Sequence, residues 1–586
     1  MRQWMVAAKK ADFYAIAEKF HVDPVVARII RNREVIGEKN IRIYLGGNLS
    51  DLSDPHQMKD MDRLGEILAQ KIRKQVHIRI IGDYDVDGVT SSHLFLTALR
   101  RVGAKVDVVI PHRIQDGYGL SLHLLQQAKE DGVDTILTCD NGIAAIDEIA
   151  WAKAQKMTVL VTDHHAVPFE EHEGRRTEKK SLADAVVNPH QQDCGYPYKE
   201  LCGAGVAWNV IRVLYENYDM DKREAEDLLD FVAMATVCDV MSLTGENRIL
   251  VKEGLKRIRH TKNIGLQALM QACNVQPENI SAYHFGYVLG PCVNATGRLD
   301  TARHALRLFE TGQETEAEEI ARDLVDLNQE RKELTLQGVE MAKKLCEEGG
   351  YENDPVLVLF LPDVHESIAG LIAGRIREMY NRPVFVLTRG EEGVKGSGRS
   401  TENYSMYENM CGCAELFTKF GGHPMAAGLS LPEENVEKFR RKINENCPLT
   451  VEEVCPDIHI DMAMPVGYAS TELVHQFALL EPFGKDNPSP LFADRNLSIS
   501  RMWVIGKNRN VLRMSVLSEY GQPVPVIFFG DVETLFAYFT EKFGQKEVEN
   551  ALHGRKNRIL FSMVYTAKID FYQGNENLQL EMKYYR

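Results

Sequence analysis

Short apolar runs alternate with amphipathic stretches between residues 76 and 187, and this alternation predicts a mostly parallel β-sheet covered by helices on both faces. Helical spacing of apolar residues falls between the runs, at 90–101, 121–129 and 144–154. The first large unit is therefore predicted to be α/β. Its expected strands lie at 76–81, 106–110, 133–138, 157–162 and 185–187.

The chain on either side of this unit shows a different pattern. Helical spacing at 24–33 and 61–72 predicts short N-terminal helices. Residues 302–348 carry long helical periodicity with many charges, which predicts a connecting helix rather than a coiled-coil arm, because clean heptads are missing. Strands at 356–361 and 384–387 around a helix near 368–380 then predict a second α/β unit, which ends in a glycine-rich region.

Beyond residue 450 the pattern changes to alternating and β-branched runs, which are typical of strands. Five such strands with one helix at 532–543 favour a small OB-type β-barrel over a β-sandwich, and they lie at 497–504, 511–516, 524–529, 559–569 and 578–584. We thus expect five segments. They are an N-terminal helical segment (1–70), a first α/β domain (71–300), a connecting helix (301–350), a second α/β domain (351–445) and an OB-type domain (446–586).

Composition narrows the range of functions. The chain has 586 residues and is 44% hydrophobic, enough for several cores. A net charge of -15 excludes a uniformly basic surface, so any nucleic-acid contact must use a local basic groove. Eleven cysteines without a C-x-x-C pair suit the reduced thiols of a cytosolic protein. No secretory leader and no apolar run of membrane-spanning length are visible, so we expect a cytoplasmic protein without a membrane partner.

Acids and imidazoles gather where the strands of the first α/β unit end. Asp83, Asp85 and Asp87 follow the first strand, residues 140–142 the third, residues 163–165 the fourth and residues 188–190 the fifth. Ligands bind at the carboxyl edge of open α/β sheets. Crowded carboxylates repel one another unless cations neutralise them, and oxygen ligands with imidazole suit Mg²⁺ or Mn²⁺. The pattern predicts a two-metal site able to hydrolyse phosphodiesters.

Other interpretations of the first acidic loop are weaker. The loop begins like an EF-hand, but Leu94 stands at the twelfth position, where a glutamate is needed. Residues 85–89 also resemble the nucleophile motif of haloacid-dehalogenase-type phosphatases, a family that does not require the partners at 140–142 and 163–165. Helix capping explains one aspartate readily, but not the whole set.

Five segments resemble motifs of the DHH phosphoesterase family, in its branch of exonucleases specific for single-stranded DNA: 82–88, 140–143, 163–165, 235–239 and 290–299. The similarity continues through 396–400, 420–423 and 480–488, and so extends over nearly the whole chain. It implies a DHH catalytic domain, a DHH-associated substrate-binding domain and an OB-type nucleic-acid-binding domain.

The resemblance also assigns roles to residues. It implies two ions, Mn²⁺ or Mg²⁺, with Asp140 bridging them, and the ligands are Asp85, Asp87, Asp140, His164 and Asp239. Supporting catalytic roles fall to Asp83, His165, Asn294 and Arg298. Two positions and one segment depart from the family pattern, the segment being 364–367, which is less glycine-rich than the usual form. Ile81 stands where relatives outside this branch often have His, and Cys292 stands where members of the branch commonly have Arg.

Substrate contacts are expected in two places. The glycine-rich stretch 395–400 offers backbone N–H groups and an Arg fork to a phosphate, although a tight structural turn would explain the glycines alone. It lacks the spacing of a nucleotide-binding P-loop, so ATP is not expected. By resemblance this pocket receives the 5′ end of DNA, with contacts from His365, Arg375, Gly396, Ser397, Gly398, Arg399, Ser400, Gly421, Gly422 and His423.

The second place is the tail, where aromatic and basic residues suit single strands. We expect Trp503 and Arg509 to contact DNA, among the neighbouring Arg501, Lys507 and Arg513, while core packing is the alternative for Trp503 alone.

The resemblance implies a 5′→3′ exonuclease that acts on single-stranded DNA and releases 5′-mononucleotides in recombination and repair. It also implies a monomer that works with single-strand-binding protein and a RecQ-type helicase. Two alternatives stay open: a DHH enzyme for short oligonucleotides or cyclic dinucleotides, and a catalytically dead replication scaffold. The scaffold would be expected to have lost ligands that this chain retains.

Overall fold

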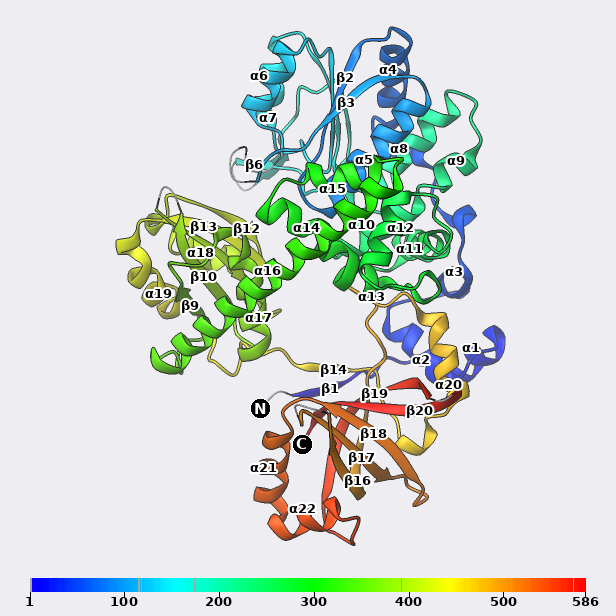
Figure 1. The fold of residues 1–586 in the computed structure, drawn as a ribbon, viewed down its shortest axis with the longest axis vertical. Helices are drawn as coiled ribbons and strands as arrows, with labels where there is room; N and C mark the ends of the chain where they lie inside the picture. Colours follow the sequence, from blue (N-terminus) through cyan, green and yellow to red (C-terminus); the bar gives the residue numbers. More distant parts are fainter. Residues whose placement is uncertain are drawn as a thin grey trace. The chain divides into compact units, whose positions relative to one another are not determined.

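The computed structural model describes residues 3–113, 116, 119–172, 175–390, 393–506, 509–572 and 574–586. Lys507, predicted to be one of the basic residues of the tail, lies outside them. The described chain divides into two compact units (Figure 1). The larger unit comprises 52–241 and 249–456, and the smaller one comprises 3–51, 242–248 and 457–586.

The first sheet of the larger unit has five strands, all parallel, in the order β3-β2-β4-β5-β8. Its strands are β2 (His77–Ile81), β3 (Lys105–Val109), β4 (Thr135–Cys139), β5 (Thr158–Thr162) and β8 (Ala185–Val187). Every residue of β4 and β8 is buried, as expected for a sheet covered on both faces. The parallel α/β sheet predicted from the apolar runs is confirmed.

Helices cover both faces of this sheet (Figure 1). One face carries α6 (Leu122–Glu130) and α7 (Ile146–Ala154). The other carries α4 (Met61–Arg73), α5 (Val86–Arg101) and α8 (Gly203–Glu216). A short hairpin, β6 (Phe169–His172) and β7 (Arg175–Glu178), interrupts the chain before β8.

A group of helices that the periodicity did not assign follows the sheet. It includes α10 (Leu229–Cys238), α11 (Gly245–Ile258), α12 (Ile264–Ala272) and α14 (Gly290–Leu299). The predicted connecting segment is helical, but it forms two helices, α15 (Arg303–Glu310) and the 35-residue α16 (Glu314–Glu348).

The second sheet has the order β12-β13-β11-β10-β9. It combines a parallel pair, β9 (Leu357–Phe360) and β10 (Val384–Gly390), with the antiparallel strands β11 (Gly393–Arg399), β13 (Ala426–Leu431) and β12 (Lys419–His423). One face packs on α17 (Ala369–Tyr380) and α16, and the other on α18 (Met406–Cys411) and α19 (Val436–Glu445). The glycine-rich stretches thus lie in strands and not in a loop.

The smaller unit is built on six strands in the order β15-β16-β17-β18-β20-β19, with β16 pairing also with β19. The five predicted tail strands correspond to β16 (Phe492–Ile505), β17 (Val511–Leu517), β18 (Pro523–Phe529), β19 (Leu560–Tyr572) and β20 (Asn575–Tyr585), joined by β15 (Met462–Ala463). The predicted helix is α21 (Val532–Phe543), and α22 (Gln545–Leu552) follows it.

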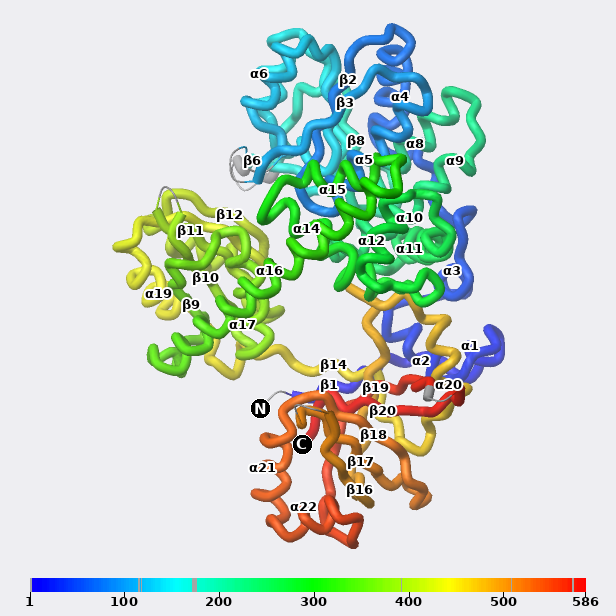
Figure 2. Tube along the Cα trace, in the orientation of Figure 1, coloured from blue at the N-terminus to red at the C-terminus, as the bar shows by residue number. Residues whose placement is uncertain are grey.

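The start of the chain belongs to this smaller unit. The helices α1 (Phe13–Phe20), α2 (Pro24–Asn32) and α3 (Glu38–Gly46) contribute apolar residues to the same core as the tail strands. β1 (Trp4–Val6) pairs with β14 (Ile458–Ile460), and Figure 2 shows the blue N-terminal chain beside the red C-terminal strands. The five predicted domain boundaries stay a prediction. Among the described residues, no helix is both long enough and apolar enough to cross a membrane.

Candidate metal centre

The loop after β2 presents two aspartates in different ways. Asp85 caps the N-terminus of α5, where its side chain accepts from the Gly88 N–H at 3.0 Å. Asp87 lies in the first turn of that helix and is almost fully buried. Its carboxylate accepts from the N–H groups of Gly203 (2.6 Å) and Ala204 (2.7 Å), which begin α8. These charge-assisted bonds at a helix N-terminus hold Asp87 in one orientation.

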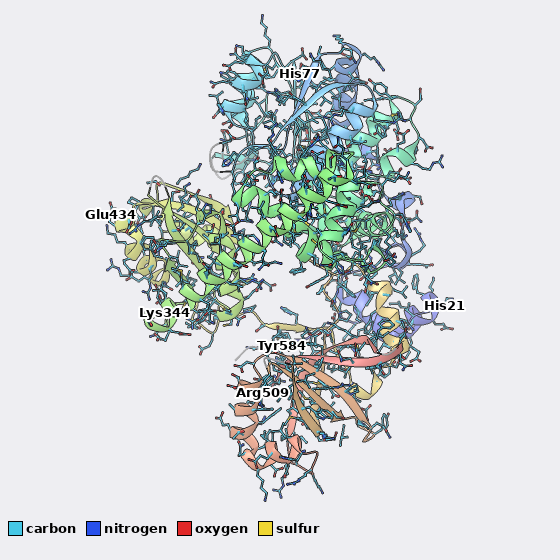
Figure 3. All side chains as sticks on the ribbon, viewed as in Figure 1. His21, His77, Lys344, Glu434, Arg509 and Tyr584 are labelled. Carbon is cyan, nitrogen blue, oxygen red and sulfur yellow. The ribbon has the colours of Figure 1, made fainter. Side chains whose placement is uncertain are left out.

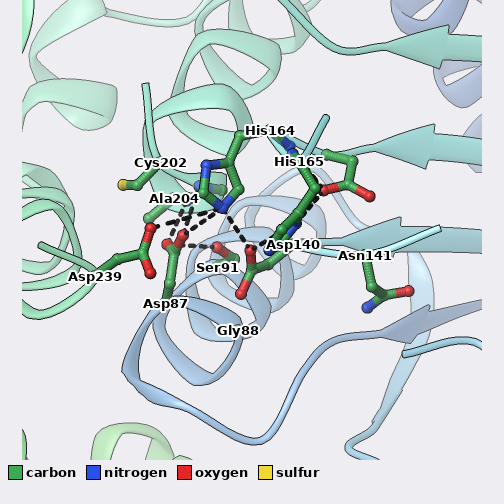
Figure 4. A network of polar contacts seen from close by, with 12 residues as sticks. Asp87, Gly88, Ser91, Asp140, Asn141, His164, His165, Cys202, Ala204 and Asp239 are labelled. Carbon is green, nitrogen blue, oxygen red and sulfur yellow. Dashed lines mark hydrogen bonds and ion pairs between the residues drawn. The ribbon is translucent and has the colours of Figure 1, made fainter. Parts of the chain in front are cut away.

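His164 connects the carboxylates that come from separate elements (Figure 4). Its Nε2 lies 3.1 Å from Asp140 Oδ1, 3.6 Å from Asp239 Oδ2 and 3.7 Å from Asp87 Oδ2. Asp140 follows β4, His164 follows β5, and Asp239 caps the end of α10. Asp140 has a positive φ of 60°, a conformation that an aspartate adopts with some strain. The fold thus brings together four of the five predicted ligands.

The potential ligand atoms form three sets, and within each set the atoms lie within 4.8 Å of one another. The first consists of Asp87, His164 and Asp239, the second of Asp83, Asp85 and Asp140, and the third of Asp140, His164 and His165. Asp140 belongs to two of the sets, as a residue shared by two ions would. The five predicted ligands, together with Asp83 and His165, therefore converge at one edge of the sheet.

The buried charges fit bound cations. Burial, followed by the charges of neighbouring aspartates, raises the pKa of Asp83, Asp85 and Asp140. Asp83 Oδ1 and His164 Nε2 are buried and have no hydrogen-bond partner among the residues that the structure describes. Divalent cations would neutralise the carboxylates and coordinate these atoms. The mixed oxygen and imidazole donors suit Mn²⁺ or Mg²⁺.

Asp163 organises the third loop although it joins none of the three sets. Its carboxylate accepts from the backbone N–H groups of Ile143, His164 and His165, and from His165 Nδ1 at 2.8 Å. Burial opposes the charge on His165, but the bond to Asp163 and the surrounding carboxylates outweigh it and raise the pKa of His165 to about 9. The imidazolium is thus oriented by Asp163, and its side chain is 41% exposed.

A basic cavity of about 430 Å³ lies in the same unit. Tyr84 and Arg113 contribute from the first sheet domain, and Arg113 lies 4.8 Å from the Tyr84 ring centroid. Lys395 and Lys419 contribute from the second, together with the acid Glu366. One acid among three cations leaves a site suited to an anion.

Arg298 extends this positive region. It donates to the Ser367 carbonyl at 2.7 Å and so connects α14 to the second sheet domain. Burial, and then the nearby Arg113, Arg331 and Arg399, lower its pKa to about 10. Burial and neighbouring arginines also lower the pKa of Arg399. Several guanidinium groups held close together suit the binding of phosphates.

The predicted phosphate contacts are only partly brought together. Gly396, Ser397 and Gly421 line the cavity. Their backbone does not form the expected N–H nest, because β11 pairs with β10 on one side and β13 on the other, so its N–H groups serve the sheet. The expectation of backbone contacts was wrong, and Arg, Lys and Ser side chains are the groups able to hold a phosphate.

The remaining predicted phosphate residues have other surroundings. A Cβ on Gly398 would overlap the side chains of Phe385 and Met406, so the backbone here is packed against the core. Ser400 is fully buried, and its hydroxyl donates to the Tyr404 carbonyl at 2.6 Å. His365 Nδ1 is 2.6 Å from Ser367 Oγ, and Arg375 is 3.7 Å from Glu378. Gly422 has a φ of 149°, and a Cβ there would overlap Ala426 and Ala427. His423 is exposed at the end of β12.

The remaining catalytic candidates lie on α14. Asn294 Oδ1 accepts from the Val86 N–H at 3.2 Å, which ties α14 to the metal-binding loop. At one of the two departures from the family pattern, Cys292 is buried and its Sγ lies 3.8 Å from Cys273 Sγ. At the other, Ile81 is buried and supplies only a backbone carbonyl, which accepts from Asn141.

In the smaller unit, Trp503 is 37% exposed, so core packing does not account for it. Arg501 lies 5.1 Å from its ring centroid, and Arg513 is its cross-strand partner. Arg509 lies in the turn between β16 and β17 on this unit (Figure 3). A cationic and aromatic face on strands is suited to stacking bases and tracking a backbone.

Sequence reasoning missed several groups at the site. The N–H donors of Gly203 and Ala204 leave no side-chain signal. Arg113 and Arg331 are isolated in the sequence, and no periodic pattern points to them. Tyr84 lies within a motif that the sequence analysis quoted, between Asp83 and Asp85. Its side chain is not a typical ligand of Mg²⁺ or Mn²⁺, so its place in the motif was a signal for a substrate contact.

Comparisons with known proteins place these features in a family. Residues 77–236 match the DHH family N-terminal domain, 353–447 the DHHA1 domain and 460–584 the RecJ OB domain. The single-stranded-DNA-specific exonuclease RecJ of Haemophilus influenzae is 32% identical over 582 residues, covering 96% of this chain and 96% of that protein. The protein of that name from Bacillus subtilis is 33% identical over 87% of this chain, but only 63% of its own length is matched.

Solved structures of RecJ proteins match this chain as well. RecJ from Thermus thermophilus in complex with Mn²⁺ superposes with a TM-score of 0.79 at 25% identity, covering 100% of this chain and 79% of that one. An exonuclease RecJ bound to manganese gives a TM-score of 0.57 at 32% identity, covering 66% of this chain and 94% of that one. The architecture and the predicted metal chemistry are therefore shared with metal-binding relatives.

Proposed function

Because this chain belongs to the RecJ family of DHH proteins, we propose that its metal centre hydrolyses the terminal phosphodiester of single-stranded DNA from the 5′ end and releases 5′-mononucleotides. The observation that carries the proposal is the convergence of three carboxylates, Asp87, Asp140 and Asp239, within 3.7 Å of His164 Nε2. An inactive scaffold has no need of such a cluster, since unneutralised buried carboxylates only destabilise it.

Two divalent cations, when bound by Asp83, Asp85, Asp87, Asp140, His164 and Asp239, supply Lewis-acid stabilisation and a water of lowered pKa. The chain's own groups position the reaction. The N–H groups of Gly203 and Ala204 fix Asp87. Asp163 accepts from Nδ1 of His165 and so orients the ring, and we assign the Nε2–H of the same ring as a donor to a phosphate oxygen or to the departing 3′-oxygen.

The basic cavity supports hydrolysis that starts at the 5′ end of the strand. Arg113, Lys395 and Lys419 line it, and Arg298 and Arg399 lie nearby, where guanidinium groups suit a terminal phosphate. Tyr84, between the ligands Asp83 and Asp85, lines the same cavity, so a phosphate bound there lies next to the metal loop. A strand held by its 5′ phosphate presents its first phosphodiester to the metals.

The direct test uses strands labelled at either end, single- and double-stranded, with Mn²⁺ and with EDTA. We expect mononucleotides to appear at once from a 5′ label on single strands only, and not with EDTA. His164→Ala and Asp239→Ala should abolish hydrolysis and leave DNA binding measurable. His123→Ala, on the exposed surface of α6, is the control. Full activity in either ligand variant would refute this site.

The biological setting is a further proposal. All eleven cysteines are unpaired, which supports a reducing cytoplasmic compartment. We propose a monomer that cooperates with single-strand-binding protein and a RecQ-type helicase, because a strand-specific exonuclease needs unwound DNA as its substrate. Pull-down of either purified partner, and light scattering of the purified chain, test these assignments separately.

A further inference from the structure

Two exposed tyrosines form a stacked pair on the larger unit. Tyr283 is 62% exposed and Tyr287 is 71% exposed, yet their rings lie only 5.1 Å apart between centroids with an interplanar angle of 24°. Large aromatic side chains left in solvent together, instead of packed into a core, are typical of a binding surface.

The backbone is built to present this pair. Tyr283 lies in α13 (Ala282–His284), and Tyr287 lies in the π-helical segment Phe285–Leu289 that continues it. Phe285 and Leu289 point inward and are fully buried, so the tyrosines occupy the opposite side. Single π-helical turns inside α-helices occur frequently at functional sites.

The segment that carries the pair packs against the end of α10, which supplies Asp239. The Phe285 carbonyl accepts from Cys238 Sγ at 3.3 Å, and Cys238 immediately precedes the ligand Asp239. A Cβ on Gly286 would lie 3.5 Å from Val237, and one on Gly290 would overlap Cys238, so the two segments are in close contact. The segment that carries the tyrosines therefore packs directly on the turn that supplies Asp239.

The loop after Asp239 adds a second unusual apolar group. Val240 is 63% exposed and has a φ of 55°, a strained conformation for a β-branched residue. Such strain persists where the surrounding structure imposes it, and it concentrates at functional sites. An exposed apolar residue thus adjoins the ligand turn on which the tyrosine segment packs.

The course of α14 shows on which side of the metal-binding loop the two tyrosines lie. The helix follows the tyrosine segment without a break, passes the metal-binding loop at Asn294, and reaches the second sheet domain at Arg298. Tyr287 and Asn294 are seven residues apart, or on the order of 10 Å along the helix axis. The tyrosines and the basic cavity thus lie toward opposite ends of α14, with the metal loop between them.

We infer that Tyr283 and Tyr287 form a base-stacking platform for the part of the single strand that lies 3′ of the bond being cut. The inference rests on the proposed exonuclease function, with the 5′ phosphate in the basic cavity. Nucleobases are the chemical class that fits, because every base has a π-face and two stacked, exposed rings offer sequence-tolerant stacking. The platform holds the trailing strand while Asp239 and its partners hold the phosphate.

The test compares a 5′-phosphorylated 20-mer with a 5′-phosphorylated dinucleotide, which is too short to reach the platform. In Tyr283→Ala/Tyr287→Ala, KM for the 20-mer should rise roughly 10-fold or more, from the usual strength of base–aromatic stacking. The dinucleotide should show no such rise. Tyr283→Phe/Tyr287→Phe should restore the 20-mer KM, since the hydroxyls are not needed. Tyr14→Ala, at a tyrosine of the smaller unit that is 78% exposed, is the matched control.

A 20-mer KM equal to wild type in the double alanine variant overturns the platform. An equal loss on both substrates also overturns it, because the damage would then come from displacement of Asp239. Failure of the proposed function is a separate result: the wild-type protein itself would show no Mn²⁺-dependent hydrolysis of either substrate. An abasic 3′ segment should weaken binding to wild type and cause no further loss in the double alanine variant.

Discussion

Gly203→Ala tests how Asp87 is held, because Gly203 serves two purposes at the start of α8. Its N–H donates to Asp87 at 2.6 Å, and its lack of a side chain lets α8 approach Asp140. A Cβ at this position would lie 2.7 Å from Asp140 Cβ and 3.0 Å from both Asp140 Cα and Oδ1. Asp140 is fixed in a left-handed conformation, so the α8 N-terminus has to move instead.

That movement should loosen both hydrogen bonds to Asp87 and displace Asp140 together. Loss of groups that orient metal ligands typically costs 10- to 100-fold in metal affinity or activity. By the relation of about 1.4 kcal/mol per tenfold change, the expected loss is roughly 1.4 to 2.8 kcal/mol. The assay is the Mn²⁺ concentration for half-maximal hydrolysis of a 5′-labelled single strand, with thermal unfolding followed by circular dichroism.

Gly205→Ala provides a matched control in the same helix. A Cβ there would meet Leu201 at 3.4 Å, an ordinary van der Waals contact, so Mn²⁺ dependence and rate should match wild type. Gly203→Ala that folds and retains the wild-type Mn²⁺ requirement and rate would refute the reasoning. So would an equal loss in Gly205→Ala, because the effect would then belong to the helix and not to Asp87.

Two further predictions concern groups outside the metal centre. The pKa of Asp230 is raised to about 6, mainly by burial, so its charged form destabilises the folded chain at neutral pH. Because the folded state then holds a proton that the unfolded state loses near pH 4, stability falls as pH rises from about 4 to 6. At roughly 1.4 kcal/mol per pKa unit, Asp230→Asn should raise the unfolding free energy by up to about 3 kcal/mol at pH 8 and leave it unchanged at pH 4. Equal melting shifts at both pH values would contradict this. Ser400→Ala should lower stability by about 1 kcal/mol, since it removes the buried bond to Tyr404, without changing KM for DNA. A KM increase without destabilisation would return Ser400 to the substrate site.

The first sheet and its ligands were predictable because both signals are local. Buried parallel strands appear as continuous apolar runs, and the residues just after them must meet at one edge. Asp140 and His164 could therefore be assigned without knowing the rest of the fold. Arg113 and Arg331 could not, because an isolated arginine has the same appearance in a sequence whether it faces solvent or a phosphate.

Other features depend on contacts between distant segments. The helices α1 and α2 share a core with strands more than 400 residues later, and β1 before them pairs Trp4 with Ile458. No periodicity in the sequence identifies these partners. The glycines of β11 were misread for a related reason. A Gly-Ser-Gly run has the composition of a phosphate loop, and only the neighbours Phe385 and Met406 show that Gly398 is glycine because two core side chains fill its place.

The energetics of the acidic cluster argue for catalysis more strongly than its composition does. Burial and mutual repulsion raise the pKa of Asp83, Asp85 and Asp140, and Asp87 beside them is fixed in place by two backbone N–H groups. A fold selected for stability alone gains by replacing such groups with apolar ones. Divalent cations reverse the balance, because they convert repulsion among the carboxylates into coordination. The same arrangement that weakens the chain without metal is therefore one in which divalent cations would be held by several carboxylates at once, as hydrolysis of a phosphodiester by metal ions requires.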